Sequence, residues 1–114
     1  MDPAKALAAE RADALARLDR LGATFDDIVD SARDSNLDDE HDTEGITIAA
    51  DRQQVAALIA VARRQLAAID AAEQRVLAGS YGVCTSCGAR IAGGRLSIRP
   101  STPWCVDCAR REQG

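Results

Sequence analysis

The chain has 114 residues, enough for one compact domain or for a small domain joined to an elongated element. With one Trp, one Tyr and one Phe, any core must consist of Leu, Ile, Val and Ala, and such a thin core needs helix packing or a metal to support it. The charged N-terminus and the lack of a long apolar run argue against a secretion signal and a membrane helix, so we expect a cytoplasmic protein.

The formal net charge of −4 is unevenly distributed. Residues 1–79 hold 16 acidic and nine basic side chains, whereas residues 80–114 hold two acidic and five basic ones. The acidic side chains concentrate in residues 26–44, which contain nine carboxylates and a single basic residue, Arg33. Because phosphate binding depends on Lys and Arg, this composition disfavours free nucleic acid and favours a protein partner with a basic or metal-bearing surface.

Residues 3–35 are predicted to form one long helix, with Pro3 in its first turn. Two interleaved seven-residue series of apolar side chains, broadened by Leu15 and Val29, define one face: Leu7, Ala14, Leu21 and Ile28, and Leu18, Phe25 and Ala32.

A second helix is predicted from about Thr47, as its N-cap, to Ala78, with Gly79 as its C-terminal cap. Its apolar positions keep helical period: Val55, Leu58, Ile59, Ala62, Leu66, Ile69, Val76 and Leu77.

Two such helices joined by a short polar loop are expected to pack as an antiparallel hairpin. The predicted fold is therefore mostly α, with a hairpin over 1–79, an acidic tip loop over 36–46, and a zinc finger with a C-terminal tail over 80–114. Leu21, Phe25, Leu58 and Leu66 are expected to be buried between the helices. A coiled-coil dimer is the alternative, but pairing within one chain satisfies the same apolar faces, so we expect a monomer.

Four cysteines form two C-x-x-C pairs, Cys84 with Cys87 and Cys105 with Cys108. This spacing predicts one structural zinc ion bound by four thiolates. A closed four-sulfur site leaves no open position for catalysis, so no enzyme activity is predicted. Iron in a rubredoxin-like site is the rival metal, and a redox dithiol lacks the βαβ pattern that it requires.

The finger also contains five arginines, for which two roles are considered: Arg90, Arg95, Arg99, Arg110 and Arg111. They either contact phosphates, as in nucleic-acid-binding zinc ribbons, or offset the negative charge of a four-thiolate zinc site. Stacking aromatics are not interleaved with them, which favours the second role or a protein contact. Tyr81 and Trp104 are expected to pack over the metal turns as core.

The predicted tip loop is crowded with carboxylates, among them Asp39, Asp42 and Glu44. Such a run is either a solvated turn or a group of charges delivered by a stiff arm to a Mg²⁺ ion or to basic residues in a channel. A calcium site is disfavoured because the alternating ligands of an EF-hand are missing, and His41 is expected to be a spectator.

The segment from Tyr81 to Cys108 reads Y-G-x-C-x-x-C-G-x-x-I-x3-R-L-x3-P-x4-C-x-x-C and closely resembles the zinc finger of the DksA/TraR bacterial transcription regulators. The motif match is specific over about 28 residues. The predicted acidic-tipped hairpin resembles the same family in architecture more than in sequence. The resemblance implies a protein that binds RNA polymerase rather than DNA, with the hairpin in the secondary channel and tip aspartates near the catalytic Mg²⁺.

The family's tip pattern, D-x-x-D-x-A, is met in part, because Asp39 and Asp42 have its spacing while Glu44 stands where Ala is expected. Some members act together with ppGpp, but the residues of this chain do not predict a ppGpp site. The alternative function is a zinc-finger nucleic-acid-binding protein with an acidic helical arm.

Overall fold

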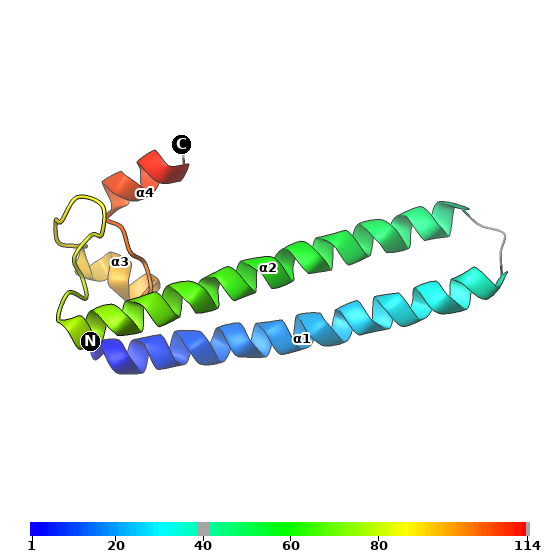
Figure 1. Cartoon of the computed structure of the whole chain (residues 1–114), viewed down its shortest axis with the longest axis horizontal. Helices are drawn as coiled ribbons and strands as arrows, with labels where there is room; N and C mark the ends of the chain where they lie inside the picture. The colour runs from blue at the N-terminus through cyan, green and yellow to red at the C-terminus, as the bar shows by residue number, and fades with distance from the viewer. Residues whose placement is uncertain (39–41, 114) are drawn as a thin grey trace. The chain divides into compact units, whose positions relative to one another are not determined.

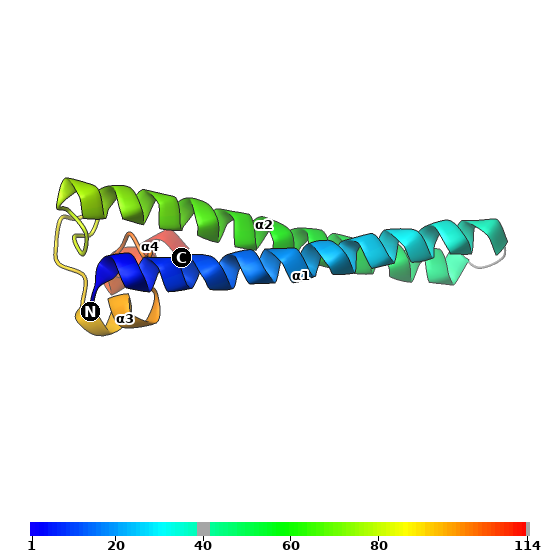
Figure 2. The same ribbon diagram turned by 90° about the horizontal axis from the view of Figure 1, so that it is seen from below.

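The structure, a computed structural model, describes residues 1–38 and 42–113, with side chains for residues 1–27 and 49–112. These ranges contain four helices (Figure 1): α1 (Pro3–Asp38), α2 (Asp42–Ala78), α3 (Gly93–Ile98) and α4 (Val106–Gln113). The chain forms two compact units, one of residues 1–14 with 65–114 and one of residues 15–64. Within each unit the segments of α1 and α2 lie side by side and antiparallel (Figures 1 and 2).

The start of α1 and the end of α2 are capped by local hydrogen bonds. The Asp2 carboxylate accepts a hydrogen bond from the Ala4 N–H at 3.0 Å, as expected of an N-cap residue directly before a proline. At the other end, Gly79 has φ 78°, its N–H donates to Val76 O, and the Ser80 N–H donates to Arg75 O. These bonds form a Schellman motif, so the prediction that Gly79 caps α2 is confirmed.

The unit of residues 1–14 and 65–114 has its helical core where α1 and α2 meet. Four side chains there are fully buried, namely Leu7, Ala14, Ile69 and Ala72. The Arg11 guanidinium bridges the two helices by donating to Asp70 and, at 2.9 Å, to Glu73. Because these charged groups remain partly exposed, the ion pairs contribute to the register of the helices more than to their stability.

The unit of residues 15–64 packs more thinly. Ala62 is buried, and five larger apolar side chains of this unit are half-buried: Leu18, Leu21, Phe25, Val55 and Ile59. Leu15 and Leu58 are 48% and 46% exposed, so the predicted burial of Leu58 is wrong. Two helices bury only the narrow a/d stripe along which they touch, and residues flanking that stripe stay in solvent.

The predicted tip loop over 36–46 is wrong in its extent, because α1 continues to Asp38 and α2 begins at Asp42. Thr47 therefore lies inside α2 and does not cap it. The loop was predicted from a lack of apolar periodicity, but a helix needs an apolar face only where it packs. Gly45 weakens a helix by about 1 kcal/mol without ending it, and residues 42–46 contain no proline.

The fold class predicted from the sequence, a mostly α chain with an antiparallel helical hairpin and a small C-terminal four-cysteine finger, is confirmed. None of the helices in the described ranges has the length and apolar character needed to cross a membrane. Residues 80–114 share a compact unit with residues 65–79, which directly precede them, and with the first 14 residues, which are distant in sequence.

Ile69 offers a direct test of the helical core. Its side chain is fully buried, so we expect Ile69→Ala to lower the free energy of unfolding by about 2–5 kcal/mol, measured by urea denaturation followed by circular dichroism. Leu77→Ala is the matched control on the same helix, because Leu77 is 81% exposed and its truncation is expected to have little effect. Equal stability of the two variants would contradict the assigned core.

Candidate metal centre

The first cysteine pair lies in a tight hairpin of the chain. Val83 and Arg90 form an antiparallel β-bridge, and the Cys84 N–H donates to Ala89 O at 2.8 Å. The Gly88 N–H returns to Cys84 O at 2.9 Å, which closes the turn that contains both cysteines. Gly88 has φ 79°, a conformation that other residues adopt only with strain, and this explains a glycine directly after the second cysteine.

The second pair is held by the start of α4. The carbonyl of Cys105 accepts a hydrogen bond from the Ala109 N–H, so Cys105 stands at the N-terminal end of the helix and Cys108 lies in its first turn. A helix N-terminus favours a negatively charged thiolate. The Thr85 N–H donates to Pro103 O at 2.9 Å and thereby ties the first turn to the segment that leads into α4.

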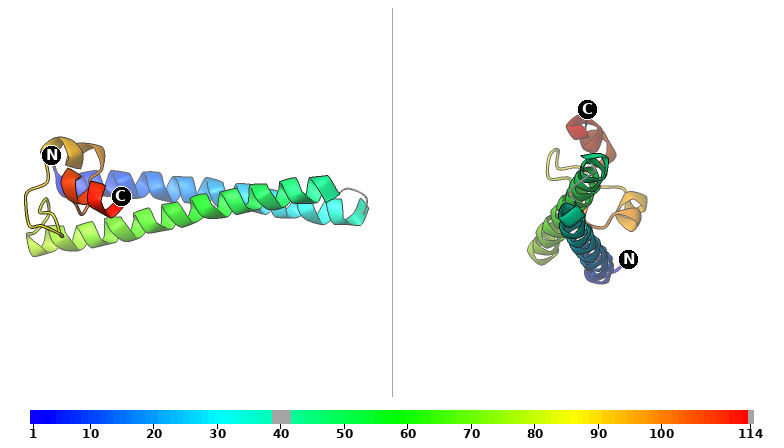
Figure 3. Two further views of the ribbon diagram at one scale, coloured as in Figure 1. Left: turned by 90° about the horizontal axis from the view of Figure 1, so that it is seen from above. Right: turned by 90° about the vertical axis from the view of Figure 1, so that its right-hand side faces the viewer.

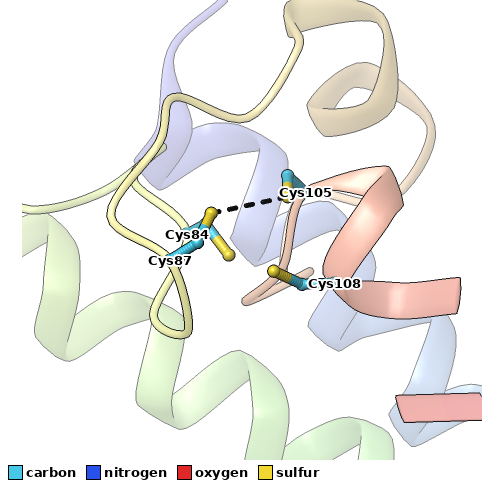
Figure 4. Close-up of side chains that lie close together, drawn as sticks. All are labelled: Cys84, Cys87, Cys105 and Cys108. Carbon is cyan, nitrogen blue, oxygen red and sulfur yellow. Dashed lines mark hydrogen bonds between the residues drawn. The ribbon is translucent and has the colours of Figure 1, made fainter. Parts of the chain in front are cut away.

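The four sulfur atoms converge on one point. All four Sγ atoms lie within 4.8 Å of one another, and those of Cys87 and Cys105 are 3.7 Å apart. Figure 4 shows the two pairs facing each other from the turn and from α4. Zinc–sulfur bonds of about 2.3 Å in a tetrahedron place neighbouring sulfurs about 3.8 Å apart, so the cluster fits a zinc ion.

The four thiols affect one another's ionisation. Burial alone would raise the pKa of Cys84, but hydrogen bonds from the backbone N–H groups of Cys87, Cys105 and Ser86 outweigh it and lower this pKa to about 6. The Ala89 N–H favours the Cys87 thiolate, yet contacts with the other three cysteines raise the pKa of Cys87 to about 11. Crowded thiolates oppose each other's ionisation, and a divalent cation removes that conflict.

The core of the finger surrounds the cysteines. Cys84, Ile91, Leu96 and Cys108 are buried together. Tyr81 and Trp104 pack against them, as predicted, and the Tyr81 hydroxyl donates to Pro100 O at 2.9 Å. Two of the four buried side chains are metal-ligand candidates, so the apolar core is small and needs the metal to supplement it.

The finger contacts α1 through a polar junction. Glu10 on α1 accepts a hydrogen bond at 3.2 Å from the backbone N–H of Ser101, a residue that is buried together with Thr102. Figure 3 shows α3 and the loop that follows it beside the N-terminal part of α1. The Glu10 charge also adds to the effect of burial in raising the pKa of Tyr81. Sequence reasoning missed Glu10, because its partner lies 91 positions away.

The arginines of the finger divide into two groups. Arg95 is committed to internal contacts, donating to Trp104 O at 2.9 Å and to the Thr102 hydroxyl at 3.2 Å. Arg111 donates to the Cys108 sulfur at 3.2 Å. Arg90, Arg99 and Arg110 are exposed. The arginines were predicted to offset the negative charge of the thiolates. Among the side chains described, Arg111 is the arginine that contacts a cysteine sulfur.

The predicted tip residues are not brought to the metal centre by any described contact. Asp39 and His41 lie outside the described residues. Asp42 and Glu44 lie in the first turn of α2, and their side chains are outside the described part. Their function therefore stays a prediction.

Comparison with known proteins identifies relatives of both the finger and the wider fold. Residues 79–114 match the family model of the prokaryotic dksA/traR C4-type zinc finger. The chain is also similar to the solved structure of the transcription factor DksA2 from Pseudomonas aeruginosa, with a TM-score of 0.52 and 25% sequence identity over 96% of this chain and 84% of that one. No curated protein sequence matches the chain. The family match and the sulfur cluster together assign a structural Zn²⁺ to the finger.

Proposed function

We propose that the chain is a zinc-finger transcription factor of the DksA/TraR type and that it regulates transcription initiation by binding bacterial RNA polymerase. In this proposal the helical hairpin enters the secondary channel of the polymerase, and acidic residues where α1 ends and α2 begins act near its catalytic Mg²⁺. Cys84, Cys87, Cys105 and Cys108 are the proposed zinc ligands, and the ion supplies folding free energy rather than catalysis.

The observation that carries the proposal is that similarity to a transcription factor extends well beyond the finger. The match to DksA2 covers 96% of this chain, whereas the finger model covers only residues 79–114. A shared zinc finger alone is compatible with many functions. A shared finger together with a shared pair of long helices supports a shared way of using them.

Charge supports the same partner. Nine carboxylates fall between residues 26 and 44, and this segment includes the end of α1 and the start of α2. An enzyme that polymerises nucleotides must hold Mg²⁺ and phosphates in a channel lined by basic groups. Carboxylates delivered there interact strongly, because a confined site screens charge less than bulk water does.

The arginines weaken the alternative of direct nucleic-acid binding. Arg95 and Arg111 donate to atoms inside the finger, so Arg90, Arg99 and Arg110 are the exposed finger arginines without such a contact among the described residues. Tyr81 and Trp104, which stacking on bases would require, pack in the core of the finger. Three phosphate contacts would give a log–log salt slope of only about −2.7, which is weak for a DNA-binding protein.

A binding experiment with purified RNA polymerase core enzyme tests the proposal. We expect the zinc-loaded protein to form a complex that persists in excess competitor DNA, measured by fluorescence anisotropy of the labelled chain. Transcription from a set of promoters should change when the complex forms. Binding to DNA without polymerase, with steep weakening as salt rises, would instead support the nucleic-acid-binding alternative and overturn this one.

A further inference from the structure

Arg111 stands apart from the other arginines of the finger, because its guanidinium reaches the metal centre. Its Nη2 lies 3.2 Å from Cys108 Sγ. Both residues belong to α4, and their spacing of three positions places them on one face of that helix. Cys108 is only 1% exposed, so Arg111 brings a cation from the surface to a buried sulfur.

The contact is electrostatic as well as geometric. The guanidinium carries a permanent positive charge, and its N–H donates to a sulfur that is negatively charged as a thiolate. A zinc ion bound by four thiolates carries two net negative charges. A guanidinium beside such a site stabilises the thiolates and lowers their reactivity toward protons and competing electrophiles.

We propose that Arg111 is a positioning residue of the zinc site, which holds Cys108 in its binding orientation and offsets thiolate charge so that zinc is retained. It binds no zinc itself. Its role is that of the hydrogen-bonding partners around metal ligands, whose loss typically weakens metal binding about 10- to 100-fold. Since the Arg111 side chain as a whole is exposed, we expect the lower end of that range.

Arg110 provides a matched control. It is exposed, belongs to the same last turn of α4 and carries the same charge, but no contact joins it to a cysteine among the described residues. Both arginines interact favourably with the C-terminal end of the helix dipole. A purely structural effect on α4 should therefore appear in both Arg110→Gln and Arg111→Gln.

The test measures zinc transfer from the full-length protein to a colorimetric chelator. We expect Arg111→Gln to release zinc about ten-fold faster than wild type, Arg111→Lys to be intermediate, and Arg110→Gln to match wild type. In protein loaded with Co²⁺, the thiolate-to-metal charge-transfer band should shift in Arg111→Gln alone, because that band reports the charge on the sulfurs. Zinc release within two-fold of wild type, or equal effects of Arg110→Gln and Arg111→Gln, would overturn the proposal.

Discussion

Replacing Cys105 by Ser is expected to abolish the folded finger while α1 and α2 keep much of their helicity. The variant retains three sulfurs, and structural zinc contributes an apparent binding free energy of about 10–16 kcal/mol that is folding free energy for a small domain. The buried core of the finger consists of Cys84, Ile91, Leu96 and Cys108, which is too little apolar surface to replace the metal. Metal analysis should find well below one zinc per chain, and limited proteolysis should cut within 80–114.

Ser86→Ala is the control for this substitution. Ser86 lies in the same turn as Cys84 and Cys87, but it contributes to the site through its backbone N–H, which the substitution keeps. It should bind one zinc and resist protease as the wild type does. Strong chelation of the wild-type protein should reproduce the Cys105→Ser pattern. A Cys105→Ser variant with full zinc content and wild-type protease resistance would show that the four sulfurs do not form one site.

The sequence predicted the fold class and the core of the finger because both depend on patterns within short segments. Heptad spacing indicated the helices, and Leu7 and Ile69 are fully buried where it placed them. The C-x-x-C spacing predicted a cluster that the structure assembles to within 4.8 Å. Tyr81 and Trp104 were placed in the core of the finger by their proximity to the cysteines in the sequence.

The features that the sequence did not predict depend on packing between distant segments. The hydrogen bond between Glu10 and Ser101 exists only because the finger folds against α1. Periodicity could not separate buried from exposed apolar positions, since Leu58 and Leu77 keep helical period and yet stay in solvent. The contact of Arg111 with Cys108 had a local signal, a spacing of three within a helix, but α4 itself was not predicted.

The acidic residues Asp39 and Asp42, where α1 ends and α2 begins, are expected to act on transcription without being needed for docking on the polymerase. Asp39 and Asp42 lie far in sequence from the core residues Leu7, Ala14 and Ile69, so changing both to Asn should leave stability unchanged. Asn keeps the size and hydrogen-bonding capacity of Asp while removing its charge. Two charges about 4 Å apart interact by about 1 kcal/mol in water but by about 4 kcal/mol at an effective dielectric constant of 20, which is typical near a protein surface.

The Asp39→Asn/Asp42→Asn variant should therefore bind RNA polymerase within a few-fold of wild type and lose nearly all of its effect on initiation in vitro. Binding and regulation are measured separately. If the wild-type protein does not bind RNA polymerase, the proposed partner is wrong, and the experiment does not bear on the role of these residues. Asp13→Asn/Asp51→Asn removes two exposed charges elsewhere on the helices and should regulate normally. If the double tip variant regulates normally even with Glu44 also neutralised, the carboxylates form only a solvated segment. The protein would then have to act on the polymerase because its helices occupy the channel, since the negative charge of the acidic segment would have no effect on initiation.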